Sequence, residues 1–500
     1  MSEHNNLIQK TLRGLIWAGS EAFARAGLQF VVLIVLTRLL TPADYGVVGA
    51  ALLVIGISQM FAQLGLGPAV VQRDFISPSH LETAFWFSMT FSLLSTAIIA
   101  LTAPLFAAFF QLPKLSPTLQ ILSLVFPLTG VVVVSESLLQ RELKFRTLAR
   151  IEVTSYFVGF GIVAIILAIL KFGLWSLVAG QLTQVFVRST QMLLAGRWAP
   201  RFRCSFQSLK ELWRFGGGQT TAQIANYIAQ SVDVMIVGKT LGASAMGIYV
   251  RAYQLMLAPS LLVGSVLEKV FFPALSKIQH QPELLARAYR QGNQFLAVLI
   301  LPIAAIIIIL APDAIPLILG QKWAGVVLPL QIFSLGLLWR TGIKISNSII
   351  RACGMARSFA FCQIMYATTV ILFAWFGSRW GITGICLGVL VSIFGSYTFA
   401  AIVCFRLTQI KFSHFLLDHV PGLLLAISVV VVGESVQMAL HSHTTPVLLS
   451  CTVMTVVMGL TILIAIGLFP AFFLGPRGEK LRIRIVTFFN RTPAFGHKSV

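Results

Sequence analysis

A stripe of basic and amide side chains lies inside an apolar segment of this chain, where a bilayer makes charge costly. Arg340, Lys344, Asn347 and Arg351 follow one another at spacings of four, three and four residues, so they share one helix face. Guanidinium groups bind phosphate or carboxylate through paired hydrogen bonds. The stripe predicts an anion site in which Arg340 and Lys344 sit deepest. Pairing with acids of other helices is the alternative.

A second polar stripe contains Gln219, Gln223, Asn226, Gln230 and Asp233, at spacings of four, three, four and three. Lipid does not satisfy such a face, so it must meet a neighbouring helix or water. Packing contacts between helices usually need one or two polar residues. A stripe over four turns therefore favours a hydrated cavity.

Two further positions add charge to apolar segments. Glu21 and Arg25 are four residues apart and share a face. Two interpretations stay open: an ion pair that locks helices together, and an arginine held toward a cavity by its own carboxylate. Arg251 adds another cation. The predicted interior is therefore cationic with a minority of acids, which indicates an anionic substrate and argues against a cation channel.

Other charges near apolar segments are weaker candidates. Glu136 and Glu152 lie near predicted membrane ends, and Arg188 lies in the predicted helix 173–195; Arg188 and Glu152 are interpreted as interfacial. Asp74 and Glu82 flank a loop that we place on the cytoplasmic side, and we expect both to be solvated.

The composition predicts an all-α polytopic membrane protein. Apolar residues make up 57% of the chain and charged residues 11%, against about 25% charged in soluble domains. The net charge of +21 is spread in small groups between apolar segments, which is typical of cytoplasmic loops and not of a nucleic-acid interface. Six cysteines form no CxxC pair, and no metal or cofactor is predicted.

About fourteen apolar segments are long enough to span a bilayer, and their length excludes barrel strands. No loop exceeds about twenty residues, which leaves no room for a soluble catalytic domain, so we expect a non-enzyme. Basic residues concentrate in alternate loops, which places both termini in the cytoplasm. We expect helices near 14–36, 45–67, 83–109, 117–139, 151–170, 173–195, 215–238, 246–272, 291–311, 325–350, 359–377, 382–404, 417–438 and 447–470.

Two turns of the chain are related by a short internal sequence repeat, which we call the echo. In residues 38–47 and 239–248 a basic residue ends an apolar helix, and a short turn opens the next helix at Gly46 or Gly247. The echo favours two six-helix lobes in a pseudo-twofold repeat, followed by two further helices. The predicted parts are an N-lobe (1–195), a basic cytoplasmic linker (196–214), a C-lobe (215–404), the last two helices (405–470) and a basic tail (471–500).

An ordered set of short motifs carries a family resemblance over about the first two-thirds of the chain. The motifs are LTRLL (36–40) with DYG (44–46), LG (64–65) with AVVQR (69–73), LQRELKF (139–145), NY (226–227) with Asp233, FPALSKIQ (272–279) and LGQKW (319–323). The chain resembles Wzx-type polysaccharide exporters of the polysaccharide transporter family, within the multidrug/oligosaccharidyl-lipid/polysaccharide flippase superfamily. Within that family it is similar to the colanic-acid-exporter branch.

The resemblance implies a bacterial inner-membrane flippase with a cationic cavity between lobes and alternating access. It implies a substrate of repeat-unit oligosaccharide on undecaprenyl pyrophosphate, for exopolysaccharide or lipopolysaccharide biosynthesis. The implied partners are membrane lipids and polysaccharide polymerase machinery, and nucleic acid is not among them.

From the charged residues and the family resemblance together, we expect the pyrophosphate and acidic sugars to bind four cations: Arg25, Arg251, Arg340 and Lys344. Sugar hydroxyls would meet the amides of Gln223, Asn226 and Gln230. Charge pairing or a coupling ion would fall to Glu21 and Asp233. Two rivals stay open: a multidrug exporter of the same superfamily, whose cavity should be rich in acids, and a membrane polymerase or ligase, which needs a large outer loop.

Overall fold

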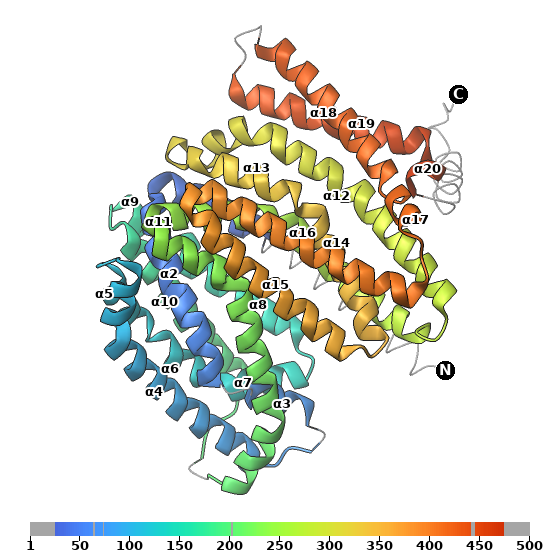
Figure 1. The fold of residues 1–500 in the computed structure, drawn as a ribbon. Helices are drawn as coiled ribbons and strands as arrows, with labels where there is room; N and C mark the ends of the chain where they lie inside the picture. Colours follow the sequence, from blue (N-terminus) through green and yellow to red (C-terminus); the bar gives the residue numbers. More distant parts are fainter. Residues whose placement is uncertain (1–25, 64–65, 74, 202–203, 442–445, 475–500) are drawn as a thin grey trace, which may run out of the picture. The chain divides into compact units, whose positions relative to one another are not determined.

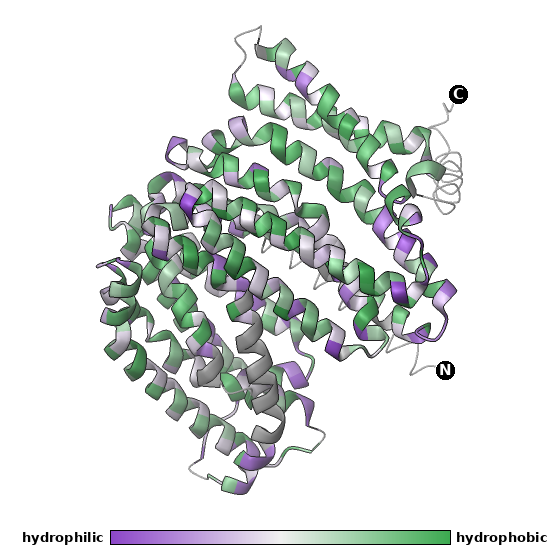
Figure 2. Cartoon of the chain, in the orientation of Figure 1, coloured by the Kyte–Doolittle hydropathy of each residue, from purple (hydrophilic) through white to green (hydrophobic). Residues whose placement is uncertain are grey.

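The computed structural model describes residues 26–63, 66–73, 75–201, 204–441 and 446–474. Over these residues all regular secondary structure is helical, which confirms the predicted all-α fold (Figure 1). Figure 2 shows apolar residues along most of each helix, with polar residues gathered toward ends and connections. A helix satisfies its own peptide hydrogen bonds, so these segments can cross a bilayer without exposing backbone polar groups to lipid.

Eight helical segments of the described chain are long and apolar enough to cross a membrane, and up to ten if each bent pair is one span. One of the eight, residues 357–408, contains two of the predicted helices. The described part of the first predicted helix, Ala26–Leu39, is apolar but shorter than a span. The number of about fourteen stays a prediction.

Two of the predicted helices, 117–139 and 325–350, are bent in the structure. A glycine, the weakest helix former after proline, stands at each break: Gly130 in one pair and Gly336 in the other. The pairs are Leu115–Gly130 with Val133–Arg141, bent by 47°, and Gln321–Leu335 with Leu337–Ala352, bent by 42°.

The chain divides into two compact units, Met1–Val250 and Arg251–Val500. The division falls inside the long helix α11 (Phe206–Lys277), which leaves helical geometry at Gly242, between two of the predicted helices. The predicted linker at 196–214 and the other lobe boundaries stay predictions.

The first unit contains α2 to α10 and the first part of α11. Its other elements are α2 (Pro42–Gln63), α3 (Leu66–Gln72), α4 (Pro78–Phe110), α5 (Leu115–Leu122), α6 (Val125–Gly130), α7 (Val133–Arg141), α8 (Phe145–Tyr156), a π-helix (Phe157–Ala164), α9 (Ile165–Ile169) and α10 (Leu174–Gly196).

Helix α4 begins at a capping box. Ser77 and His80 each satisfy a free backbone N–H of the first turn, and Pro78 takes the first helical position, where no N–H is needed. Close to this start, Phe85 of α4 packs in a buried cluster with Val70 of α3 and Val134 of α7. The cluster ties three helices together near one end of the first unit.

The two turns related by the internal echo pack reciprocally in the first unit. A Cβ on Gly46 would overlap the carbonyl oxygen of Ala243, and a Cβ on Gly247 would overlap that of Pro42. In the echo, Pro42 aligns with Ala243 and Gly46 with Gly247. The same pair of positions therefore meets twice with the roles exchanged, as at a twofold interface.

The second unit contains the remainder of α11 and the helices that follow it. They are α12 (Pro282–Leu319), a 3-10 helix (Gln321–Val326), α13 (Val327–Leu335), α14 (Leu337–Ala352), α15 (Ala356–Gly377), a 3-10 turn (Ser378–Trp380), α16 (Gly381–Thr408), α17 (Phe412–Leu417), α18 (Val420–His441), α19 (Val447–Leu468) and α20 (Pro470–Leu474).

The last long helices, α18 and α19, lie side by side and pack on α12 (Figure 1). Ile309 of α12 shares a buried cluster with Val429 of α18 and Met458 of α19. Near the other end of α12, Arg290 forms a paired hydrogen bond with Asp418, with nitrogen–oxygen distances of 2.7 and 2.9 Å. These contacts fix the helices beyond the predicted repeat to the second unit.

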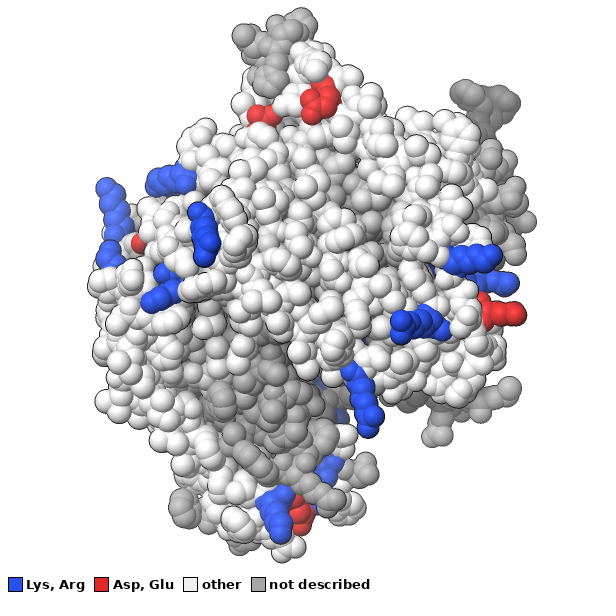
Figure 3. Space-filling view, viewed as in Figure 1, with Lys and Arg blue, Asp and Glu red and all other residues white. Residues whose placement is uncertain are grey.

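The described surface is largely apolar. On the face drawn in Figure 3, charged side chains gather in a few small groups, and wide areas between them carry none. Large apolar side chains point outward within predicted spans, such as Leu101, 80% exposed, and Leu463, 68% exposed. Such a surface suits hydrocarbon as its solvent.

Candidate functional site

Arg340 lies on the polar stripe of α14, as the spacing predicted. Its Nη1 donates to the hydroxyl of Tyr366 on α15 at 2.8 Å. The guanidinium carbon lies 5.5 Å from the ring centre of Tyr366 and 5.8 Å from that of Tyr253 on α11. Cations are attracted to aromatic faces at these distances. Two tyrosines from different helices therefore orient this arginine.

Lys344 stands one turn further along α14. Its Nζ lies 3.4 Å from the carbonyl oxygen of Ser260 on α11. The hydroxyls of Ser260 and Thr341 lie 3.1 Å apart, and both residues are fully buried. Small hydroxyl residues let two helices approach closely and hydrogen-bond across their contact. Helices α11 and α14 are therefore joined next to the lysine.

Arg251 begins the second unit and is 9% exposed. Its guanidinium carbon lies 5.7 Å from the ring centre of Trp323, a fully buried tryptophan of the 3-10 helix. Nη1 also donates to Oε1 of Gln254 at 3.0 Å, one turn along α11. The guanidinium group of Arg251 is thus held by the ring of Trp323 and the side-chain amide of Gln254.

Three of the four predicted cations lie in the second unit, one on α11 and two on α14, and both cations of α14 contact residues of α11. We call Arg251, Arg340 and Lys344 the cation cluster. The contacts described above are with rings, a phenol, an amide and a carbonyl oxygen. These contacts orient the side chains, and guanidinium and ammonium groups are the side chains that suit an anion such as a phosphate or a uronate. The fourth predicted cation, Arg25, lies outside the described residues.

Asp233 ends the predicted stripe on α11 in the first unit, and it is 2% exposed. Its Oδ2 accepts a hydrogen bond of 2.7 Å from the hydroxyl of Tyr249, which is fully buried, and its Oδ1 accepts one of 2.8 Å from the Val234 N–H. Gln230 is exposed. The side chains of Gln223 and Asn226 lie outside the described residues, as does Glu21, so the role of this stripe stays a prediction.

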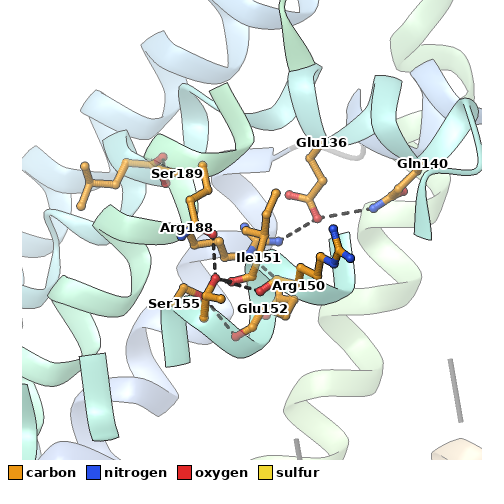
Figure 4. Close-up of polar contacts among 11 residues, drawn as sticks. Glu136, Gln140, Arg150, Ile151, Glu152, Ser155, Arg188 and Ser189 are labelled. Carbon is orange, nitrogen blue, oxygen red and sulfur yellow. Dashed lines mark hydrogen bonds and ion pairs between the residues drawn. The ribbon is translucent and has the colours of Figure 1, made fainter. Parts of the chain in front are cut away.

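Arg188 joins three helices of the first unit (Figure 4). Its Nε donates to Oε1 of Glu152 on α8 at 2.6 Å, and its Nη2 donates to Oε1 of Glu136 on α7 at 2.8 Å. All three side chains are between 18% and 28% exposed. The sequence analysis treated the three residues separately and interpreted Arg188 and Glu152 as interfacial. The missed signal was one arginine that follows two acids on consecutive predicted helices.

The expectation that Glu82 is solvated is wrong. Glu82 is 5% exposed, and its Oε2 has no hydrogen-bond partner among the described residues. It lies on α4 beyond the capping turn, beside the buried cluster of Phe85 and Val134. The prediction placed Glu82 beside a polar loop, whereas the residue lies within the first turns of α4. Asp74, the other acid of this pair, lies outside the described residues.

Comparison with known proteins decides the family. Residues 35–328 match the model of a family described as "Polysaccharide biosynthesis protein", which is more than half of the chain. The chain belongs to this family. Its membership confirms the resemblance to Wzx-type exporters of the flippase superfamily that the ordered motifs predicted.

Two curated relatives of this polysaccharide biosynthesis protein show how far the similarity extends. It is 30% identical over 328 residues to the succinoglycan biosynthesis transport protein ExoT of Rhizobium meliloti (strain 1021), covering 65% of this chain and 66% of the relative. It is 25% identical over 393 residues to the lipopolysaccharide biosynthesis protein WzxC of Escherichia coli (strain K12), covering 77% of this chain and 79% of the relative.

The fold of this polysaccharide biosynthesis protein is also that of a solved flippase. The lipid II flippase MurJ in an inward closed conformation matches with a TM-score of 0.73 at 14% identity, over 91% of this chain and 98% of MurJ. Together with its relatives, this likeness makes the chain a multi-pass membrane protein of the bacterial inner membrane.

Proposed function

We propose that this chain flips a lipid-linked oligosaccharide from the cytoplasmic to the outer face of the inner membrane. The observation that carries the proposal is the cation cluster of the second unit. Arg251, Arg340 and Lys344 are costly inside a membrane protein unless they serve a ligand or a partner. The relatives are named for polysaccharide biosynthesis and transport, which makes a phosphorylated sugar lipid the anion of choice.

The substrate we propose is a repeat unit on undecaprenyl pyrophosphate, with the pyrophosphate on the cation cluster. Arg340 suits this role because Tyr253 and Tyr366 orient its guanidinium, so little side-chain freedom is lost on binding. Lys344 supplies a point charge one turn away. Arg25 would add a fourth cation, while Gln223, Asn226 and Gln230 would hydrogen-bond to sugar hydroxyls. Sugars also pack on aromatic faces, which this region offers.

The mechanism we propose is alternating access. The lipid tail stays in the bilayer while the head group enters from the cytoplasm and leaves on the other side. With both termini in the cytoplasm, an inside-negative potential favours the exit of an anion by about 2.3 kcal/mol per charge per 100 mV. Glu21 and Asp233 remain the proposed positions for charge pairing or a counter-ion. We propose polysaccharide polymerase machinery as the partner on the outer side.

The test uses a deletion strain that carries an inducible copy of the chain. Arg340→Ala and Lys344→Ala should each lower polysaccharide export at least about 10-fold, since a hydrogen bond to a charged group is lost. Complete lipid-linked repeat units should accumulate on the cytoplasmic face. Membrane abundance should match the parent. Arg379→Ala is the matched control, because this exposed arginine also lies against a ring, 5.4 Å from that of Phe376.

The outcome separates the rivals. Normal export by both variants would remove the cation cluster from the mechanism. Unpolymerised repeat units on the outer face would indicate a polymerase or ligase. Loss of drug resistance, with no change in lipid-linked sugar, would indicate a multidrug exporter.

A further inference from the structure

A buried polar network in the second unit has no part in the proposed mechanism. Its members are Asn293 on α12, Tyr397 on α16 and His419 in the turn between α17 and α18. All three side chains are at most 9% exposed. Polar groups buried this deeply are stable only when they are hydrogen-bonded, so a hydrogen that the network lacks has a cost.

Two backbone carbonyl groups fix the roles of His419 and Asn293. Nδ1 of His419 lies 2.7 Å from the carbonyl oxygen of Phe415. Because a carbonyl oxygen only accepts, Nδ1 carries a hydrogen, and Nε2 of the neutral ring is an acceptor. Nδ2 of Asn293 donates to the carbonyl oxygen of Tyr289 at 2.8 Å, which identifies the other amide atom, Oδ1, as an acceptor.

The hydroxyl of Tyr397 lies between these two acceptors. Its oxygen is 3.3 Å from Nε2 of His419 and 3.5 Å from Oδ1 of Asn293. Both distances are longer than the roughly 2.8 Å that is usual for a hydroxyl donor. A phenol has one hydrogen and serves one of the two acceptors at a time. While His419 is neutral, the network is therefore one hydrogen short.

One proton on His419 supplies the missing hydrogen. Nε2 of the imidazolium donates to the oxygen of Tyr397, which has lone pairs to accept it. The hydrogen of Tyr397 is then released to Oδ1 of Asn293. After this exchange the ring nitrogen, the hydroxyl and the amide oxygen each have a partner. The hydrogen bonds then run without a gap from the α17–α18 turn through α16 to α12.

The charges around His419 also bear on its proton. Burial disfavours an imidazolium, and a nearby carboxylate favours it. Asp418 precedes His419 in the chain, and it pairs with Arg290 of α12 at 2.7 Å. Among the described residues, no hydrogen bond or ion pair joins His419 to the other titratable groups of α12, α16, α17, α18 and α19. Those groups are Glu283, Arg287, Tyr289, Asp313, Cys386, Cys404, Arg406, His414, Glu434 and Cys451.

The network reaches the helix that carries two members of the cation cluster. Tyr289, whose carbonyl oxygen holds Asn293, has its hydroxyl 3.0 Å from that of Ser346 on α14. Ser346 lies two positions after Lys344, and its carbonyl oxygen accepts from Sγ of Cys404 on α16 at 3.6 Å. Helices α12, α14 and α16 are therefore hydrogen-bonded to one another. A proton that joins α16 to α12 acts on the frame that holds Lys344.

We propose that His419 is a proton-binding site, and that its proton transfers the hydrogen bond of Tyr397 from His419 to Asn293. With the proton bound, α12, α16 and the α17–α18 turn form one hydrogen-bonded frame. Without it, Oδ1 of Asn293 loses its donor and the contact between α12 and α16 loosens. The predicted orientation puts Arg406 and Lys411 in the cytoplasm, so the proton would enter from that side. The proton site goes beyond the proposed function, and only its effect on export rests on that function.

The first test is spectroscopic and needs no substrate. Infrared difference spectra between alkaline and acid pH are recorded on the full chain in lipid, with ring-labelled tyrosine. We expect an imidazolium band and a shift of one tyrosine C–O band at the same midpoint. His419→Gln should remove both, and Tyr397→Phe should remove the tyrosine shift. The matched control is His414→Gln, which replaces an exposed histidine of α17 and should keep the coupled bands. An imidazolium band of His419 with no tyrosine shift, or no band that His419→Gln removes, overturns the site.

Asn293→Leu tests the second acceptor. Leucine has a similar volume but offers no oxygen to the hydrogen that Tyr397 releases, so the protonated network is less stable. We expect the midpoint of the His419 band to fall by about 0.5–1 pH unit, the worth of one neutral hydrogen bond. An unchanged midpoint overturns the transfer of the hydrogen bond to Asn293.

Transport provides the functional arm. In inverted membrane vesicles the medium replaces the cytoplasm, so its pH sets the proton supply of the α17–α18 turn. The rate at which the parent moves lipid-linked sugar should change with this pH around the infrared midpoint, and the rate of His419→Gln should not. A pH dependence that persists in His419→Gln overturns the coupling to transport. If the parent moves no lipid-linked sugar while the infrared bands behave as expected, the proposed function fails and the proton site stands.

Discussion

The carbonyl oxygen of Ala243 fills the space that a Cβ on Gly46 would need. The contact joins the start of α2 to the turn at which α11 breaks, more than 190 positions away in the chain. Its counterpart, between Gly247 and Pro42, repeats the same geometry with the echo-related residues exchanged. The two turns therefore recognise each other through backbone atoms, which have no side chain that can move aside.

Gly46→Ala should lower the free energy of unfolding of the first unit by about 1–3 kcal/mol, the cost of overpacking a tight contact. Gly247→Ala should have the same effect. Gly49→Ala is the matched control on α2, because its Cβ would meet the Met246 methyl at an ordinary 3.9 Å. Thermal unfolding of the purified protein in detergent measures the effect. Equal stability of Gly46→Ala and Gly49→Ala would contradict the reciprocal contact.

Tyr249→Phe should destabilise the protein by about 1–3 kcal/mol, because it leaves Oδ2 of Asp233 buried without its 2.7 Å donor. Asp233→Ala tests the pairing through a double-mutant cycle. Once the carboxylate is gone, Tyr249→Phe should cost much less than in the parent. Additive losses in unfolding temperature would show that the hydroxyl and the carboxylate do not act together.

Arg188→Lys should behave almost like Arg188→Gln, since the two glutamates are reached by different nitrogens of one planar fork. We expect each variant to lose about 1–3 kcal/mol, given the partial exposure of the three side chains. Adding Glu136→Gln and Glu152→Gln to Arg188→Gln should recover part of the loss, because no charge is then left alone. The check is the unfolding midpoint of each purified variant. A lysine that restores full stability would argue against the bridging role.

The attachment of Glu211 should depend on pH. Its pKa is lowered in the folded protein, first by the hydrogen bond from Arg73 and then by that from His80. A depressed carboxyl contributes stability above its unfolded pKa, about 4.3, and that contribution is lost as the pH falls through the lower folded value. The melting temperature of the parent should therefore exceed that of Glu211→Gln at neutral pH, and the two should converge in acid. A difference that persists unchanged in acid would contradict this assignment.

Much of the molecule was predictable from local patterns. Long apolar segments in a chain with 11% charge indicated an all-α membrane protein, because hydrocarbon tolerates few other folds. The four-three-four spacing of Arg340 and Lys344 predicted a basic face on one helix, and the ordered motifs predicted the family. These inferences needed only helix periodicity and the energetics of burial.

The bends were harder to foresee. The helix pairs that meet near Gly130 and Gly336 correspond to single predicted helices, because hydropathy averages over a window and does not detect a break of one or two residues. The division of α11 at Gly242 was anticipated by the echo, since a short turn recurs at matching positions.

By itself, the sequence determined the solvent this protein needs, its helical nature, its family and the helix faces that carry charge, since these follow from residue type and a period of 3.6. Only the tertiary structure decided which side chains meet each charge: Tyr253 and Tyr366 lie around Arg340, and Glu136 and Glu152 bind Arg188. Each of these relations joins segments that are distant along the chain. Local spacing carries no information about such pairs, because the partner is chosen by packing and not by register.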